Sequence, residues 1–170
     1  VRAAEDPVIF VEHILLYTSR GEVPDEPYVV PIGKADVKRR GEDFTIVAYS
    51  RMVQVALAAA QTLEERGISA EVIDLRSLRP WDKETVLESV ERTGRALIVE
   101  EAWRAGGFGA EVASVIQEEA FDYLDGPVGR IGGAEVPMPY NRELERAAIP
   151  KPEQVVQAVH AALNRSTSPL

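Results

Sequence analysis

Short apolar runs alternate with segments of helical periodicity along most of this chain, and this alternation constrains its fold more than any other feature. The runs lie at 44–50, 69–75, 95–100 and 127–131, and each is nearly continuous in apolar residues. Strands of this kind are buried on both faces of a sheet, whereas a strand with one solvated face alternates apolar and polar residues. The sequence therefore predicts an α/β fold in which a mainly parallel sheet is covered by helices on both faces.

Four segments have the apolar spacing of amphipathic helices. They span residues 52–65, 83–92, 108–123 and 152–163. Gly67 and Gly94 follow the first two segments, at the position where glycine commonly ends a helix. Asp82 precedes the second segment and is predicted to be its N-cap, because a carboxylate there accepts hydrogen bonds from the first helical turn.

The composition suits a single domain and argues against several kinds of partner. Hydrophobic residues make up 45% of the 170 residues, which is enough for a sizeable core. The net charge of −9 argues against nucleic acid, because phosphate binding requires an excess of lysine and arginine. No apolar run has the length of a membrane span, so no membrane partner is expected. The chain has no cysteine, which excludes disulfides and thiolate metal sites.

The first 41 residues differ from the regular pattern that follows. Residues 7–13 form an apolar run suited to a buried strand, whereas residues 14–41 lack any period and contain three prolines. We interpret residues 14–41 as an extended connector and place a domain boundary there. Residues 1–6 look like the tail of an earlier helix, so we expect the chain to be a piece of a longer one. Residues 166–170 are predicted to be a frayed tail.

The segment 132–140 contains two prolines, two glycines, a methionine and a tyrosine. Neither a helical nor a strand period explains it, and it is too rigid and too apolar for a free linker. We expect an ordered loop that packs Met138 and Tyr140 against another surface. The identity of that surface determines whether the chain acts alone or within a larger assembly.

Three residues at the ends of predicted strands form a candidate anion site, because open parallel sheets bind ligands beyond their carboxyl ends. Ser50 precedes a helix, whose N-terminus favours anions, and Arg76 and Arg79 follow the second strand of the regular region. Capping of this helix is the favoured role for Ser50. For the two arginines the favoured role is to fix the loop through ion pairs with neighbouring acids, namely Asp74, Glu100 or Glu101.

Other motifs favour structural roles. The glycine-rich segment 106–111 enters a helix after a strand, but it lacks the third glycine of a dinucleotide-binding loop. His13 and His160 do not have metal-ligand spacing. Glu100 and Glu101 are adjacent carboxylates, for which ion pairing is the simpler role. Because no nucleophile, base and orienting group come together, the sequence predicts no catalytic site.

Several loops together resemble one family. The segments that carry the resemblance are 48–52, 73–80, 100–104, 107–111 and 134–140, with 31–35 in the connector. In order and spacing they are similar to the β subunit of the thiamine-diphosphate-dependent 2-oxo acid dehydrogenases, with pyruvate dehydrogenase the nearest match. The resemblance extends over nearly the whole chain, from about residue 7 to residue 163.

This resemblance implies a domain organisation. Residues 42–165 match a transketolase C-terminal-like domain, a three-layer α/β/α sandwich around a mostly parallel five-stranded sheet with one antiparallel strand. Residues 1–13 match the last strand of a truncated pyrimidine-binding domain, and residues 14–41 match the connector between the two domains.

The resemblance also implies an activity. In this family thiamine diphosphate and magnesium support the oxidative decarboxylation of a 2-oxo acid, and the acyl group passes to a lipoyl arm. The glutamate that activates the cofactor lies upstream of the matching region, so the resemblance implies no catalytic and no cofactor-binding residue in this chain. We therefore expect the chain by itself to bind no cofactor and to be catalytically inert.

The implied partners are an α subunit, a second β subunit across a two-fold axis, and the subunit-binding domain of the acyltransferase component. Asp125 falls where an acidic residue of relatives contacts that basic domain, and the negative net charge suits such a partner. The alternative role for Asp125 is in a turn-forming Asp-Gly pair.

The resemblance also implies a potassium site and a location. Ala4 and Asp6 fall where relatives hold potassium through backbone groups, although relatives often have aspartate where this chain has alanine. We expect a bacterial cytoplasmic location rather than the mitochondrial matrix.

Two other functions fit parts of the sequence. The first is a stand-alone α/β module that binds an anion or nucleotide at the strand ends near Ser50, Arg76 and Gly107. The second is the corresponding domain of a transketolase or a deoxyxylulose phosphate synthase. Those enzymes are single chains whose loops do not usually have the Val-Pro-Met-Pro-Tyr of residues 136–140.

Overall fold

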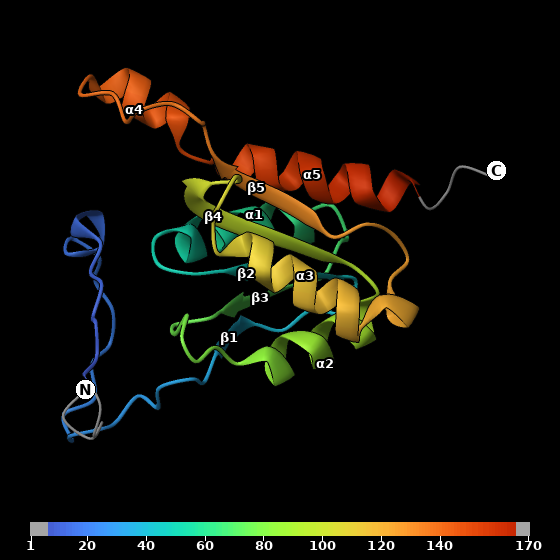
Figure 1. Ribbon diagram of the computed structural model, residues 1–170, viewed down its shortest axis with the longest axis horizontal. Coiled ribbons are helices and arrows are strands. Elements are labelled where there is room, and N and C mark those ends of the chain that lie inside the picture. The colour runs from blue at the N-terminus through green and yellow to red at the C-terminus, as the bar shows by residue number, and fades with distance from the viewer. Residues whose placement is uncertain (1–6, 166–170) are drawn as a thin grey trace.

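The computed structural model describes residues 7–165 and contains a five-stranded sheet with helices on both faces (Figure 1). The strands are β1 Asp36–Arg39, β2 Phe44–Ala48, β3 Ala70–Asp74, β4 Ala96–Trp103 and β5 Gly129–Gly133. The helices are α1 Met52–Glu64, α2 Lys83–Thr93, α3 Gly109–Glu119, α4 Arg142–Ala148 and α5 Pro152–Arg165. Two short 3-10 turns are also present, η1 Ile14–Leu16 and η2 Phe121–Tyr123.

The strand order is β1-β3-β2-β4-β5, with β1 antiparallel to β3 and the remaining neighbours parallel. Helices α1 and α5 cover one face of the sheet, and α2 and α3 cover the other (Figure 1). The predicted three-layer α/β/α sandwich, with one antiparallel strand in a mostly parallel five-stranded sheet, is therefore confirmed.

Alternate residues of the central strands supply two apolar cores, because successive side chains of a strand point to opposite faces. Ile46 of β2 packs on the side of α1 and α5, and Val47 packs on the side of α2 and α3. Leu97 and Ile98 of β4 divide between the two cores in the same way. Both faces of these strands are covered, which explains why their apolar runs are continuous.

The antiparallel strand β1 lies inside the segment that the sequence presents as an extended connector. The backbone just before it is also attached to the domain, since the N–H of Ala35 donates a hydrogen bond to Asp82 Oδ2 at 3.0 Å. Residues 33–41 thus belong to the sheet domain, and the connector is shorter than the predicted 14–41. The four residues of β1 are mostly charged, so no apolar run reveals this strand in the sequence.

The strand predicted at residues 7–13 does not form. A strand needs a neighbour for its N–H and C=O groups, and this segment lies away from the sheet (Figure 1). Its apolar side chains are exposed, including Ile9, Phe10 and Val11. His13 contacts the domain through its Nε2 atom, 3.2 Å from Glu101 Oε2. The predicted tail, residues 166–170, lies outside the described residues.

Two helices differ from the prediction. The predicted helix 108–123 is shorter in the structure, and the loop after β5 contains a helix that the sequence does not predict. Helix α3 ends at Glu119 because Ala120 leaves the helical conformation, with φ −125° and ψ 17°, and η2 follows as a separate turn. The helix α4 was not predicted, since seven residues are too few to display an apolar period. Its cap is Asn141, whose side chain accepts hydrogen bonds from two N–H groups of the first turn.

Asp82 is the N-cap of α2, as predicted. Its buried carboxylate accepts hydrogen bonds from the Thr85 hydroxyl at 2.9 Å and from the Ala35 N–H at 3.0 Å. Burial by itself raises the pKa of this carboxyl, but these hydrogen bonds and the charge of Lys34 outweigh burial, so the pKa of Asp82 lies below its ordinary value. The side chain therefore links the start of α2 to the segment before β1.

Replacing Asp82 by asparagine should lower the free energy of unfolding by about 1 kcal/mol at neutral pH, because the uncharged amide is a weaker acceptor. The pKa of Asp82 is lower in the folded state, so the unfolded state binds the proton more readily. The stabilisation is therefore complete above about pH 4 and is lost as the pH falls further. Urea unfolding of both proteins over this pH range should show the difference shrinking in acid. A difference independent of pH would contradict this role.

Candidate functional site

Two residues of the predicted anion site, Ser50 and Arg76, lie beyond the carboxyl ends of β2 and β3 with left-handed backbone angles, φ 55° and 53°. The guanidinium of Arg76 donates hydrogen bonds to the carbonyl oxygens of Lys34 and Ala35 at 3.2 and 3.1 Å. Arg76 thus holds the segment before β1 against the sheet. Helix α1 has no side-chain cap, so Ser50 does not take the favoured role of capping it.

Arg79 lies in a different environment. It is exposed and lines an open hollow of about 510 Å³ together with Trp81, Phe108 and Glu111. Within residues 7–165 its guanidinium has no hydrogen bond or ion pair. Neither Ser50 nor Arg76 lines this hollow, so the structure does not bring the three predicted residues into one site.

Glu100, at the carboxyl end of β4, is completely buried and is the centre of the polar contacts at this edge. Arg130 of β5 donates a hydrogen bond to Glu100 Oε1 at 2.8 Å. The hydroxyl of Tyr49 and the N–H of Gly109 donate to Glu100 Oε2 at 3.1 and 2.9 Å. A buried carboxylate requires such partners, and here they come from three other segments of the chain.

The glycines of segment 106–111 are explained by this carboxylate. A Cβ atom on Gly107 or Gly109 would lie within 2.6 Å of a Glu100 carboxylate oxygen, which is closer than real Cβ atoms approach. The segment therefore surrounds a protein carboxylate and lets α3 begin next to the sheet. This agrees with the interpretation as a tight turn rather than a dinucleotide loop.

Tyr49 completes the packing at the crevice between β2 and β4, where the following helices α1 and α3 leave to opposite faces. Burial, and then the charge and hydrogen bond of Glu100, raise the pKa of Tyr49, so this phenol remains a hydrogen-bond donor. Its ring meets Phe108 edge to face at a centroid distance of 6.3 Å. Open α/β sheets bind ligands at such a crevice, and here Tyr49 and Glu100 are hydrogen-bonded to each other there.

Arg130 is a site residue that the sequence pattern did not reveal as the partner of Glu100. Its guanidinium also donates a hydrogen bond to the carbonyl oxygen of Arg104 at 2.7 Å. The available signal was a single arginine within the otherwise uncharged predicted strand 127–131. Because interior charges are almost always paired, that arginine implied a buried carboxylate on a neighbouring strand.

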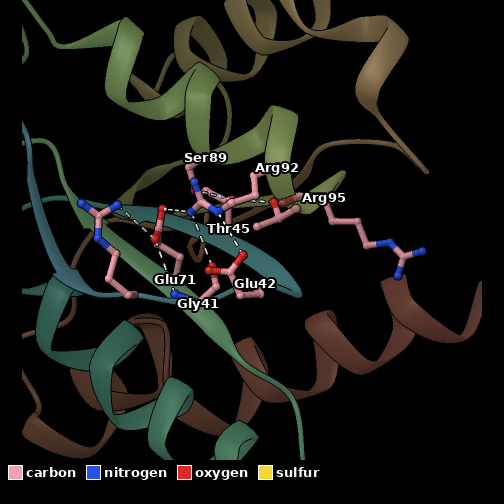
Figure 2. Close-up of polar contacts among 9 residues, drawn as sticks. Gly41, Glu42, Thr45, Glu71, Ser89, Arg92 and Arg95 are labelled. Atoms are coloured by element: carbon pink, nitrogen blue, oxygen red, sulfur yellow. Dashed lines mark hydrogen bonds and ion pairs between the residues drawn. The ribbon is translucent and has the colours of Figure 1, made fainter.

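A second buried carboxylate, Glu71, lies near the amino end of β3 (Figure 2). Arg92 of α2 donates a hydrogen bond to it at 2.7 Å, and the N–H of Gly41 donates at 3.4 Å. Arg40 lies 3.6 Å from the same carboxylate. These contacts join α2 and the residues that follow β1 to β3.

Beside Glu71, buried hydroxyl groups connect β2 with α2 (Figure 2). The Thr45 hydroxyl contacts the hydroxyls of Ser89 and Thr93 at 2.7 Å each. Thr93 also donates to the carbonyl oxygen of Arg95 at 3.1 Å. The hydroxyls satisfy one another, so this cluster fixes the position of α2 on the sheet.

Asp125 lies in the turn after η2, between α3 and β5. Its N–H donates a hydrogen bond to the carbonyl oxygen of Gly94 at 2.8 Å, and its carboxylate lies 3.4 Å from Arg95. The side chain of Asp125 is 61% exposed. Asp125 therefore has a structural role in the turn and still presents its charge to solvent.

The β5–α4 lobe, defined as residues 134–148, projects from the rest of the domain (Figure 1). Its ends are joined by a hydrogen bond from the Ala134 N–H to the Ala148 carbonyl oxygen at 2.8 Å. Tyr140 is fully exposed, and Val136, Met138 and Leu144 are between 44% and 59% exposed. The loop is closed at its base, but in the described part of the chain it does not bury Met138 or Tyr140, so the predicted packing of these two side chains does not form.

The remaining predicted sites concern metals and membranes. His13 contacts Glu101, and His160 Nε2 lies 3.2 Å from Arg66. Within residues 7–165, no group of three histidine, cysteine, aspartate or glutamate side chains is arranged to hold a metal ion. Ala4 and Asp6, the predicted potassium positions, lie outside the described residues. Among the described helices, none is long and apolar enough to cross a membrane.

Residues 33–155 match the family of transketolase C-terminal domains, and the chain belongs to that family. The family match begins at residue 33, which is also where the structure begins to attach the chain to the sheet domain. The relatives of this chain include β subunits of the pyruvate dehydrogenase E1 component, so the predicted resemblance is confirmed.

Three of these relatives span plants and bacteria. The mitochondrial β-2 subunit of Oryza sativa subsp. japonica is 49% identical over 165 residues, and the match covers 95% of this chain and 44% of the relative. The mitochondrial β subunit of Pisum sativum is 50% identical, covering 95% and 46%. The β subunit of Rickettsia felis is 44% identical, covering 91% and 48%. The chain thus spans about half the length of the curated relatives that it matches.

Solved structures agree on the fold. A split-gene transketolase, described as an inactive β4 tetramer, superposes with a TM-score of 0.71 at 36% identity, covering 86% of this chain and 46% of that chain. A transketolase from Pichia stipitis superposes with a TM-score of 0.51 at 19% identity, covering 78% and 18%. At that identity the second likeness concerns the fold alone.

Proposed function

We propose that this chain is the C-terminal assembly and docking portion of the β subunit of a pyruvate dehydrogenase-type enzyme. The complete enzyme would carry out the oxidative decarboxylation of a 2-oxo acid with transfer of the acyl group to lipoyl. The proposal is supported by identities of 44–50% to pyruvate dehydrogenase E1 β subunits over more than nine tenths of this chain. It is also supported by the geometry of the carboxyl edge, where side chains of the chain itself occupy the crevice.

The observation that carries the assembly role is the exposure of the β5–α4 lobe. Tyr140 is fully exposed and Met138 is 53% exposed, although the lobe has a defined backbone and a capped helix. A seven-residue helix is marginal by itself and normally depends on packing of its apolar face. Exposed apolar side chains that gather on one part of the surface are typical of an interface between subunits. We assign the lobe to the contact with the α subunit.

Thiamine diphosphate and magnesium would belong to the complete enzyme. The residues described in this chain do not fit them: the described range has no group of metal-ligating side chains, and Glu100 is already saturated by Arg130, Tyr49 and Gly109. A carboxylate with all its partners inside the domain is unsuited to proton transfer with a cofactor. The chain would therefore contribute binding surfaces and no reactive group.

The amino end of the sheet is the proposed docking surface for the basic subunit-binding domain of the acyltransferase component. Asp125 lies there with 61% of its side chain exposed. The net charge of the chain, −9, would steer a basic partner toward this subunit. A second β subunit across a two-fold axis would place two such surfaces in one assembly.

Incubation of the purified chain with thiamine diphosphate, magnesium and pyruvate should release no carbon dioxide. Titration calorimetry should show binding to the α subunit of the same enzyme. Replacing both Met138 and Tyr140 by serine should weaken this binding by about tenfold or more, because buried aromatic anchors dominate interface energies. Turnover by the chain alone would overturn the proposal.

The matched control is Tyr28→Ser, which removes an exposed tyrosine outside the lobe. This variant should bind the α subunit as the unaltered chain does. Equal binding by the Met138 and Tyr140 double variant would show that the lobe is not the contact with the α subunit.

A further inference from the structure

We propose that the hollow beside Arg79 binds a small organic anion that carries an aromatic ring. The hollow lies between two loops at the carboxyl edge of the sheet, one that follows β3 and one that follows β4. Open α/β sheets bind ligands in crevices beyond this edge. The volume of the hollow, about 510 Å³, is that of a small-molecule site. It shares no lining residue with the β5–α4 lobe or with the turn at Asp125.

Two aromatic side chains form an apolar wall of the hollow. The rings of Trp81 and Phe108 meet edge to face at a centroid distance of 6.3 Å, and Phe108 meets Tyr49 at the same distance. Trp81 and Phe108 are only partly buried, so part of each ring is available to a ligand. Leu78, which is 37% exposed, extends the apolar surface. A flat ring placed here would gain both apolar burial and aromatic contact.

Arg79 supplies a positive charge at the exposed edge of the hollow. As noted above, its guanidinium has no hydrogen bond or ion pair within residues 7–165. Arg76, in the same loop, is instead engaged by the carbonyl oxygens of Lys34 and Ala35. A guanidinium binds a carboxylate or a phosphate through two parallel hydrogen bonds. Arg79 therefore selects an anionic group, and the aromatic wall selects the ring attached to it.

Glu111 is the other charged side chain that lines the hollow. In the described part of the chain it forms no hydrogen bond or ion pair, so its negative charge directs a bound anion toward Arg79. Aromatic rings beside a carboxylate can also attract a cation. Arg79 repels a cation, however, and no described residue pairs with its guanidinium. The unpaired arginine thus favours an anion, and a cationic ligand is the alternative that the experiment has to test.

Both loops are attached to the domain before a ligand arrives. The Oγ atom of Ser77 accepts a hydrogen bond from the Gly33 N–H at 3.0 Å, and the loop that contains Ser77 ends at Asp82, the N-cap of α2. On the other side of the hollow, the Gly109 N–H donates to Glu100 Oε2 at 2.9 Å. A site whose walls are already in place loses little entropy on binding, which favours measurable affinity for a small ligand.

The test uses simple compounds that separate the ring from the charge. Phenylacetate and phenyl phosphate carry both features, and they distinguish a carboxylate from a phosphate as the anionic group. Acetate and inorganic phosphate lack the ring, and benzylammonium carries a ring with the opposite charge. At least one of the two anionic ring compounds should bind with a dissociation constant of about 1–10 mM, because so small a ligand makes few contacts. The other three compounds should bind at least about tenfold more weakly.

Binding can be followed by NMR through the indole N–H signals of the isotope-labelled chain. The chain has two tryptophans, of which Trp81 lines the hollow and Trp103 does not. Titration should shift the Trp81 signal to saturation and leave the Trp103 signal unchanged. The variant Trp103→Phe assigns the two signals.

Two substitutions change the hollow in different ways. Arg79→Met should weaken binding of the anionic ring compounds about fivefold, because it removes the cation and keeps an unbranched side chain. Ala110→Phe should abolish binding, because Ala110 is exposed and lines the hollow, and a phenyl group there would occupy the space. The matched control is Arg20→Met, which removes an exposed arginine of the connector and should bind as the unaltered chain does. Circular dichroism melting curves establish that each variant is folded.

Several results would overturn the proposal. One is a Trp81 signal that no compound moves, and another is tighter binding of benzylammonium than of either anionic ring compound. Equal binding of acetate or inorganic phosphate would show that the ring is not recognised. Equal losses in the Arg79 and Arg20 variants would show a general charge effect. If Arg79→Met does not fold, unchanged binding by Ala110→Phe is sufficient to reject the site. None of these results bears on binding to the α subunit, so the proposed function is tested separately.

Discussion

Replacing Arg130 by methionine is expected to lower the free energy of unfolding by about 3–5 kcal/mol, the largest effect of any single change considered. The substitution removes the hydrogen bond at 2.8 Å to Glu100, a carboxylate with no exposed surface. Tyr49 and Gly109 would remain as partners on the other carboxylate oxygen, but neither carries a compensating charge. A buried carboxylate without its cation is strongly destabilising. Urea unfolding followed by circular dichroism would measure the loss.

The control is the double variant that also replaces Glu100 by glutamine. Removing the charge together with its partner should recover much of the lost free energy, because the cost arises from the unpaired carboxylate and not from the missing pair itself. If Arg130→Met costs less than about 1 kcal/mol, the carboxylate must be neutralised in some other way and the described network is wrong.

Replacing Arg92 by methionine is expected to cost about 2–3 kcal/mol of unfolding free energy. Arg92 donates to Glu71 at 2.7 Å, and Glu71 is 1% exposed (Figure 2). The cost should be smaller than for Arg130, because Arg40 lies 3.6 Å from the same carboxylate and can compensate in part. Thermal and urea unfolding of the variant would measure this difference.

Arg40→Met is the matched control for Arg92→Met. The side chain of Arg40 is 76% exposed, so solvent screens its interaction and the change should cost at most about 1 kcal/mol. Both substitutions remove one arginine near Glu71, and they differ in the geometry and burial of the contact. Equal losses in the two variants would contradict the assignment of Arg92 as the principal partner.

Most of the fold could be predicted from local patterns. The runs around Phe44, Ala70 and Ala96 were recognised because strands buried on both faces are continuously apolar. The ends of α2 were recognised because Asp82 and Gly94 are typical capping residues, and both act as caps. These features depend on residues within a few positions of one another.

The elements that local sequence patterns miss or misplace depend on distant contacts. The strand β1 has little apolar character and forms because β3 offers a free edge. Residues 7–13 are apolar enough for a strand, but the described chain gives them no neighbour to pair with. The helix α4 is too short to display a period. In each case the outcome depends on which segment lies alongside.

For the candidate site as well, the sequence singles out residues, whereas only the structure shows their contacts. The sequence identified Arg76, Glu100 and the loop 132–140 as unusual, but it did not determine what each one contacts. The structure directs Arg76 to two backbone carbonyls, Glu100 to Arg130, and the Met138 and Tyr140 side chains to solvent. Charged side chains can pair with any of several neighbours, so only the tertiary arrangement decides among them.

The amino-acid sequence by itself determined the α/β class, the covering of the sheet on both faces and the family, because these follow from apolar periodicity and from loop residues in a fixed order. The tertiary structure alone decided that Glu100 is enclosed by Arg130, Tyr49 and Gly109, and that Met138 and Tyr140 are exposed. The physical reason is the separation of the interacting residues along the sequence. Periodicity is a property of neighbouring residues, whereas pairing and exposure depend on segments that folding brings together or leaves apart.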